Sequence, residues 1–349
     1  MYQTSLETQQ IWNGYRRLHG SVWEDISTGE TFDAETNWYS SHAATGDPCV
    51  KMSLLGVSHS MGIEAPGFNS NSIYFITKPE RFINGNIHDS HFAHKYCAPF
   101  YGDNIKCTPE AMFGSANLNA LEKFKDSKIL IVAGGPSAAE RQWDPSDYDY
   151  VFSCNHFYLN EKLSKHDVAY AIFADEVALS LKNERLINYL NANSTIVCLD
   201  DRIAHLAHAR PSKRQEAEDT VSFLNKEYPD QHMFVHFRYR SRVGTGTRLI
   251  LSAIFFGAKQ IHFVGVDGMA PDTKIGDLHN HAFQEGKRYN SENLQYDRYR
   301  RHYTAFWHYV INGLKAHERI EFQNLGEGHR CNQSTAISRQ LFPLIGATT

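Results

Sequence analysis

Two glycine-containing loops and one histidine have the residue types and the spacing to do chemistry in this sequence. The first loop, Gly134-Gly135-Pro136-Ser137, follows a run of four aliphatic residues and precedes Ala-Ala-Glu. A buried strand that turns through glycines into a helix start presents backbone N–H groups to an anion or a ribose. The loop therefore predicts a nucleotide-binding turn. The alternative is a structural turn in which Ser137 only caps the helix.

The second loop, Arg242-Val-Gly-Thr-Gly-Thr247, precedes an apolar helical stretch that starts at Leu249. Its backbone amides, the hydroxyls of Thr245 and Thr247, and the Arg242 guanidinium could together hold a phosphate or a carboxylate. The spacing differs from that of a P-loop. Neither loop matches G-x-G-x-x-G, which disfavours an NAD or FAD site.

His302 lies in Tyr299-Arg-Arg-His302, near the start of an expected long helix. An imidazole can accept a proton from a hydroxyl at neutral pH, which makes His302 a candidate general base among the 19 histidines of the chain. His279-Asn-His281 has the spacing of a metal-binding pair, but no third ligand is evident. Asp147-Tyr-Asp149 matches the D-x-D pattern of metal-dependent glycosyltransferases, but it precedes a strand and is interpreted as a solvated turn.

Strand-like runs alternate with helical stretches from residue 126 onward. This alternation predicts an α/β fold, a Rossmann-like doubly wound sheet that is mostly parallel. The expected strands are 128–134, 149–154, 168–174, 194–199, 232–237, 260–266 and 320–325, and the expected helices are 176–192, 201–226, 246–258 and 291–317. In such a sheet the ligand crevice lies beyond the carboxyl ends of the strands. The residues expected there are polar or glycine: Gly134 to Ser137, Asn155, Asp175, Asp200-Asp201, Asp267 and Asn324.

Residues 1–125 show few periodic stretches. We expect an N-terminal extension or a small α+β domain of unknown role, with strands near 50–56 and 71–78 and a helical stretch at 116–125. Residues 126–349 are expected to form the Rossmann-like nucleotide-binding domain.

Composition narrows the class of protein. The net charge of −4 gives no general attraction to nucleic acid or anionic lipid. The six cysteines include no C-x-x-C pair, which favours a reducing compartment. The N-terminus lacks the pattern of a signal peptide, and no apolar run is long enough to span a membrane. We therefore expect a cytoplasmic protein, with peripheral membrane contact left open.

Several blocks, in order, resemble the bacterial lipooligosaccharide sialyltransferases, whose donor is CMP-sialic acid. The family motifs are A-G-N-G-P-S, C-N-x-F-Y, R-[IV]-T-S-G, G-[IV]-D and Y-x-x-H. The matching blocks begin at Ala133, Cys154, Arg242, Gly265 and Tyr299, respectively. The resemblance covers roughly residues 126 to 326. It also has departures: Gly134 stands where the family turn has asparagine, Asp175 replaces another asparagine, and Met269 replaces a tyrosine.

The resemblance implies a metal-independent inverting glycosyltransferase that moves a sugar from a nucleotide-activated donor to an acceptor hydroxyl. A CMP-sugar is the first candidate for the donor. His302 would be the general base, with Arg242 and Tyr299 as further catalytic candidates. The expected nucleotide- and donor-binding residues are Gly134, Gly135, Ser137, Asn155, Asp175, Thr245, Gly246 and Asp267. No metal or other cofactor is expected. The acceptor would be a glycan or another hydroxyl-bearing molecule, and a homo-oligomer is left open.

Two alternatives stand beside this interpretation. The G-G-P-S turn also resembles that of the 6-hydroxymethylpterin diphosphokinase-like proteins, which would imply diphosphate transfer from ATP. The departures at Gly134, Asp175 and Met269 are compatible with a nucleotide-binding protein that has lost catalysis.

Overall fold

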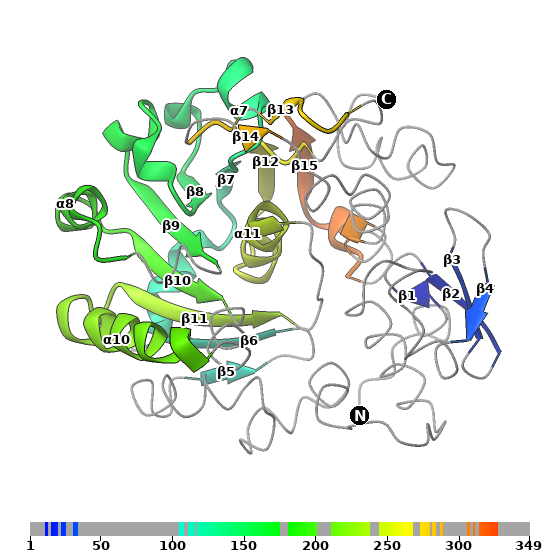
Figure 1. Cartoon of the computed structure of the whole chain (residues 1–349), viewed down its shortest axis with the longest axis horizontal. Coiled ribbons are helices and arrows are strands. Elements are labelled where there is room, and N and C mark those ends of the chain that lie inside the picture. Colours follow the sequence, from blue (N-terminus) through cyan, green and yellow to red (C-terminus); the bar gives the residue numbers. More distant parts are fainter. Residues whose placement is uncertain are drawn as a thin grey trace.

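The computed structural model of the chain describes a central sheet with its flanking helices, and a smaller N-terminal sheet (Figure 1). The residues described are 11–12, 15–19, 22–25, 31–33, 105–107, 111–115, 117–174, 181–200, 211–237, 244–267, 273–279, 281–283, 287–288, 306–307, 310 and 314–326.

The central sheet has nine strands within this described part, in the order β15-β12-β7-β8-β9-β10-β11-β6-β5. The first seven in this order are parallel: β15 (Glu321–Asn324), β12 (Gln260–Val264), β7 (Lys128–Val132), β8 (Tyr150–Cys154), β9 (Val168–Phe173), β10 (Ile196–Asp200) and β11 (His232–Phe237). All seven strands expected from the sequence are present, and the predicted mostly parallel α/β fold is confirmed.

The strand order changes direction at β7. From β7 the chain moves outward through β8, β9 and β10 to β11, and then returns to place β12 on the other side of β7. Strands β7 and β12 are buried along almost their whole length, as expected for largely apolar runs in a parallel sheet. The carboxyl ends of β7 and β12 therefore form the topological switch point, where open α/β sheets bind ligands.

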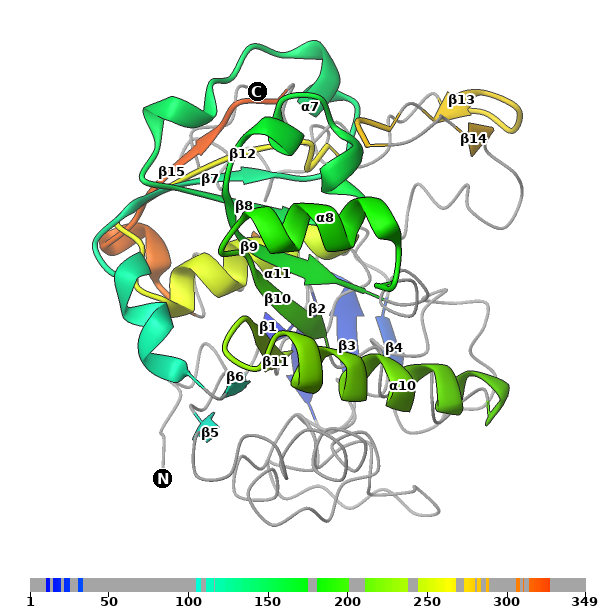
Figure 2. The same cartoon turned by 90° about the vertical axis from the view of Figure 1, so that its left-hand side faces the viewer.

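Helices cover both faces of the sheet. Helices α8 (Glu184–Ala192) and α10 (Pro211–Glu227) lie on one face, and α11 (Gly244–Phe255) lies on the other (Figures 1 and 2). Helix α11 is buried from Thr245 to Ile254, as expected for a helix that is apolar nearly all round. It carries the chain from β11 to β12 and contacts β7, β8 and β9. Of the expected helix at 291–317, the described residues Phe306, Trp307 and Val310 are helical, and Trp307 stacks on Phe263 of β12. The expectation is wrong at its end, because Leu314 is in a bend and Lys315 is left-handed, with φ +48°.

The sheet begins before residue 126, the expected start of the nucleotide-binding domain. Strands β5 (Ile105–Cys107) and β6 (Ala111–Ser115) extend it in antiparallel pairing beyond β11. They cover an edge that β11 would otherwise expose. The helical stretch expected at 116–125 is present as a 3₁₀ helix, η2 (Leu118–Phe124), with Asn117 as its N-cap.

The N-terminal sheet is antiparallel and was not expected from the sequence. It contains β1 (Ile11–Trp12), β2 (Tyr15–His19), β3 (Val22–Asp25) and β4 (Thr31–Asp33). The strands expected at 50–56 and 71–78 lie outside the described residues.

Candidate functional site

Ser137 and Asp267 join the turns that follow the two switch-point strands. The Ser137 hydroxyl donates to Asp267 Oδ1 at 2.5 Å, and the Ser137 backbone N–H donates to Asp267 Oδ2 at 2.8 Å. The same hydroxyl accepts from the Gly265 N–H at 2.8 Å. Both side chains are buried, so these bonds form away from competing water. The two turns are thereby fixed to each other across 130 residues of sequence.

Glycines allow the two turns to approach this closely. Gly135 donates its N–H to the Gly265 carbonyl at 2.9 Å, and a Cβ on Gly135 would lie only 2.5 Å from that oxygen. Gly265 has φ +75°, and a Cβ there would overlap the carbonyl of Ala133. A Cβ on Gly326, in the turn after β15, would lie 2.8 Å from both Ser137 Oγ and Asp267 Oδ1. The switch point therefore depends on glycine at three places in three segments.

Asn155 connects the end of β8 to its neighbours. It adopts the left-handed conformation with φ +52°, which asparagine tolerates better than most residues. Its Oδ1 accepts from the Ala174 N–H at 3.1 Å, and its Nδ2 reaches Thr245 Oγ1 at 3.5 Å. The side chain therefore links the ends of β8 and β9 to the first turn of α11.

The first turn of α11 lies against the switch point. A Cβ on Gly246 would be 2.9 Å from Val266 Cγ2 and 3.0 Å from Ala133 Cβ, so glycine permits this close packing. Thr245 and Thr247 are buried, and Thr247 donates its hydroxyl to the Gly244 carbonyl at 3.1 Å. The second glycine loop of the sequence therefore ends beside the first one.

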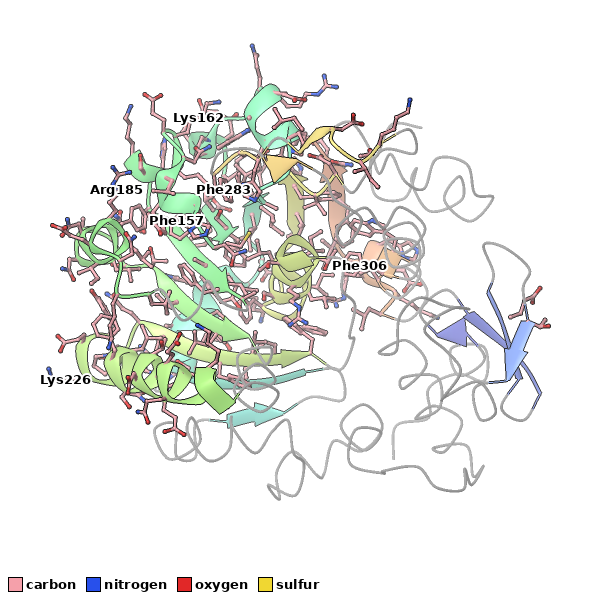
Figure 3. The ribbon with its side chains drawn as sticks, in the orientation of Figure 1. Phe157, Lys162, Arg185, Lys226, Phe283 and Phe306 are labelled. Carbon is pink, nitrogen blue, oxygen red and sulfur yellow. The ribbon has the colours of Figure 1, made fainter. Side chains whose placement is uncertain are left out.

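The short segment 281–283 covers the glycine turn of β7. Its Ala282 N–H donates to the Gly134 carbonyl at 3.0 Å, and the Asn160 amide donates to the Ala282 carbonyl at 3.4 Å. Phe283 is buried, and Figure 3 shows its label close to that of Phe157, which follows β8. The His281 ring lies over Gly134, where a Cβ would overlap it.

Two expectations about the first loop need correction. The helix α7 (Ser137–Glu140) is a single turn, capped by Pro136 without a side-chain hydrogen bond, so Ser137 is not the N-cap. The Gly135 and Ser137 amides already bond to the Gly265 carbonyl and the Asp267 carboxylate. The long helix that begins at this edge of the sheet, with the larger dipole, is therefore α11, which has 12 residues, and not α7.

Side chains beside Asn155 form a second polar group at this edge. The Tyr158 hydroxyl lies 3.5 Å from His156 Nδ1. Burial raises the pKa of Tyr158, and the nearby positive charge of Arg185 partly opposes this shift. The tyrosine therefore stays protonated at neutral pH and can donate or accept a hydrogen bond.

The structure brings together seven of the predicted site residues: Gly134, Gly135, Ser137, Asn155, Thr245, Gly246 and Asp267. Their role in binding a ligand remains a prediction. Asp175, Arg242, Tyr299 and His302 lie outside the described residues. The sequence analysis missed two contributions at this edge, the Gly326 turn and the position of His281 over Gly134.

Candidate metal ligands do not gather in the described part of the chain, where no group of three or more His, Cys, Asp or Glu side chains has a suitable arrangement. The side chain of His279, the proposed partner of His281, lies outside the described residues. In the D-x-D sequence, Asp149 Oδ2 accepts from the Lys128 N–H at 2.8 Å, at the amino end of β7. The Asp149 carboxylate therefore binds the backbone at the start of β7, at the opposite end of that strand from the switch point.

Comparisons with known proteins gave matches to solved structures alone. No protein-family model and no curated protein matches the chain. A variant of the sialyltransferase CstII in complex with CMP is 15% identical over 64% of this chain and 86% of its own, with a TM-score of 0.36. CstII from Campylobacter jejuni with the substrate analogue CMP-3FNeuAc is 13% identical over 64% and 88%, with a TM-score of 0.33.

A third solved structure is the monofunctional alpha-2,3-sialyltransferase Cst-I from Campylobacter jejuni. It is 14% identical over 64% of this chain and 84% of its own, with a TM-score of 0.33. Similarity at this level does not establish a family. Separately, none of the helices in the described residues has the length and apolar character needed to cross a membrane.

Proposed function

We propose that this chain is a glycosyltransferase that takes its sugar from a nucleotide-activated donor, with a CMP-sugar as the first candidate. One observation carries the proposal. The glycine turn after β7, the Asn155 amide after β8 and the first turn of α11 meet at the topological switch point of a parallel sheet. Polar groups that converge at this place are typical of nucleotide sites.

The geometry supports a division of roles within the site. The N-terminus of α11 offers its first backbone N–H groups and the positive end of its dipole to the phosphate. Asn155 would read the nucleoside, because its amide can both donate and accept. Ser137 and Asp267 are buried and bonded to each other, so they would position the turns and not touch the donor directly.

The proposed reaction is a single displacement. The acceptor oxygen attacks the anomeric carbon, the bond from that carbon to the phosphate oxygen breaks, and the nucleoside monophosphate leaves with the bonding electron pair. His302 would take the proton of the acceptor hydroxyl. Arg242 and Tyr299 would stabilise the negative charge on the leaving phosphate. No metal ion is required in this scheme, and the configuration at the anomeric carbon is inverted.

A donor panel tests the proposal. The purified chain is incubated with CMP-, UDP-, GDP- and ADP-sugars, with and without EDTA, and release of the nucleotide is followed by chromatography. We expect release from a CMP-sugar that EDTA does not change. Magnesium-dependent AMP release from ATP would instead support the diphosphokinase alternative, and nucleotide affinity without turnover of any donor would support a non-catalytic binding protein.

The His302→Ala variant tests the proposed base. Loss of a general base typically lowers the rate by roughly 10²–10⁴-fold. We expect transfer to fall by this amount while the affinity for the nucleotide, measured by calorimetry, stays within twofold of the wild type. Unchanged turnover in the variant would remove His302 from the mechanism.

A further inference from the structure

Asn160 connects two segments that follow different strands of the central sheet. Its side-chain Oδ1 accepts from the backbone N–H groups of Lys162 and Leu163, both at 3.1 Å. Its Nδ2 donates to the Ala282 carbonyl at 3.4 Å. The side chain therefore ties the connection that follows β8 to residues 281–283, a segment that we name the strap.

The hydrogen-bond network determines which way the Asn160 amide points. Two backbone N–H donors face one end of the amide, so that end is the carbonyl oxygen, and the –NH₂ end then faces the Ala282 carbonyl. The two ends have different roles. The oxygen shapes the connection between β8 and β9, where Leu163 is fully buried, and the nitrogen binds the strap. A substitution can therefore remove one contact and keep the other.

The strap in turn holds the peptide group between Gly134 and Gly135. The carbonyl of this group belongs to Gly134 and accepts from the Ala282 N–H at 3.0 Å. Its N–H belongs to Gly135 and donates to the Gly265 carbonyl at 2.9 Å. Two successive glycines have no Cβ to restrict rotation of the peptide plane between them. The two hydrogen bonds therefore fix an orientation that the backbone alone would not restrict.

We propose that Asn160 is a positioning residue of the nucleotide site, which acts through the strap on the orientation of the Gly134–Gly135 peptide group. The inference rests on the proposed function, since it concerns the same turn after β7. Asn160 itself touches neither the donor nor the acceptor. Without its Nδ2 donor, the strap binds the turn in a smaller fraction of the molecules, and the apparent affinity for the nucleotide falls with that fraction.

Two variants of Asn160 in the full chain test the inference. Asn160→Asp keeps an oxygen for the two backbone N–H groups but directs a second oxygen at the Ala282 carbonyl, so it loses the donor and places two acceptors against each other. Asn160→Ala removes both contacts. Asn193→Asp is the matched control. The Asn193 Nδ2 donates to the Tyr189 carbonyl at 2.9 Å at the C-cap of α8, shortly before the amino end of β10.

Titration calorimetry gives the affinity of each protein for CMP, UMP, GMP and AMP, and hydrogen exchange with mass spectrometry follows peptides that cover the strap. We expect Asn160→Asp to weaken binding of the best nucleotide about threefold to tenfold, in line with the loss of one hydrogen bond, and to speed exchange in the strap. Asn160→Ala should weaken binding at least as much. The Asn193→Asp control should match the wild type both in nucleotide affinity and in exchange of the strap.

Each contrary outcome falls on a different statement. If the wild type binds a nucleotide and Asn160→Asp binds it equally well, the positioning role through the strap is wrong while the proposed function stands, even where Asn160→Ala binds more weakly. If the wild type binds none of the four nucleotides, the proposed function fails together with this role. Hydrogen exchange decides independently whether Asn160 holds the strap, because unchanged exchange of the strap in Asn160→Asp would contradict that contact.

Discussion

The two ends of the central sheet contain similar residue types but use them differently. At the amino end, Lys128 lies over the Tyr148 ring at 4.5 Å, and the Tyr148 hydroxyl lies 3.0 Å from His262 Nδ1. At the carboxyl end, Ser137, Asp267 and His281 lie on or beside turns that contain glycine. The amino-end contacts join side chains across adjacent strands, whereas the carboxyl-end contacts join backbone turns from distant parts of the chain.

This difference shows that residue type alone does not mark a site. A tyrosine, a histidine and a lysine also come together toward the amino end, but no glycine-containing turns converge on them among the contacts that these residues make. The carboxyl end differs because the strand order reverses there and glycines let three turns approach one another. Variants at the two ends should therefore differ both in stability and in nucleotide binding.

The largest effect is expected from Gly265→Ala. The substitution places a Cβ at φ +75° and against the Ala133 carbonyl. Left-handed strain costs about 1–2 kcal/mol and overpacking adds about 1–3 kcal/mol. We expect the free energy of unfolding in urea to fall by roughly the sum, about 2–5 kcal/mol.

Gly276→Ala is the matched control for this variant. Gly276 also has positive φ, +93°, but a Cβ there would meet nothing within 4 Å. It should lose only the conformational part, about 1–2 kcal/mol. Equal losses in the two variants would show that close approach of the turns contributes nothing.

Ser137→Ala should have the next largest effect. It removes a buried hydrogen bond to the Asp267 carboxylate and leaves the Gly265 N–H without its acceptor. We expect a loss of about 2–3 kcal/mol in the free energy of unfolding, measured in urea. Ser146→Ala removes the same kind of bond, from a serine hydroxyl to Asp144, at an exposed turn. No measurable loss is expected in that control. Similar losses in both variants would contradict the claim that burial makes the Ser137–Asp267 hydrogen bond the stronger of the two.

Tyr148→Phe probes the amino end. It removes the hydroxyl that contacts His262 Nδ1 in a partly buried position. We expect the free energy of unfolding to fall by about 1 kcal/mol. Nucleotide affinity, measured by calorimetry, should not change. A weakened affinity would mean that the two ends of the sheet are coupled.

The smallest effect is a pH dependence of stability at the amino end of β11. Burial lowers the pKa of His232 below its usual value of 6.5, although a hydrogen bond with the Tyr228 carbonyl opposes this shift. Because the folded state disfavours the charged ring, its contribution to stability is complete above pH 6.5 and is lost as the pH falls through the folded-state pKa.

The wild type should therefore lose more unfolding free energy between pH 7.5 and 5.5 than His232→Asn, which keeps a donor for the Tyr228 carbonyl. Urea unfolding at the two pH values measures this difference. A steeper loss in the variant would show that the pKa of His232 is not lowered in the folded state.

The core of the fold could be predicted from sequence because its signals are local. Ile129 to Val132 form an unbroken aliphatic run, and the apolar stretch from Leu249 follows a loop of glycine and threonine that indicates a helix start. The short edge strands β5 and β6 have no such signal. Strand β6 pairs with β11, which lies more than 100 residues away, and β5 joins the sheet only through β6. The N-terminal strands pair locally, but they mix charged and aromatic residues and so lack the apolar pattern that predicts a strand.

The candidate site was predictable only in part. Gly134, Asn155 and Thr245 stand at strand ends or helix starts that the sequence marks clearly. The Ser137–Asp267 bond depends on strand order, which local pattern does not determine. His281 was considered only as half of a metal pair, because its position over Gly134 depends on a contact between segments nearly 150 residues apart.

Hydrogen exchange with mass spectrometry, in the presence and absence of saturating CMP, tests the central claim most directly. Binding at the switch point should slow exchange in peptides that cover 133–138, 153–157, 244–248 and 281–283, and leave peptides at 145–149 and 228–232 unchanged. Protection confined to the latter peptides, or no protection by CMP, UMP, GMP or AMP anywhere in the chain, would contradict a nucleotide site at the carboxyl ends of β7 and β12.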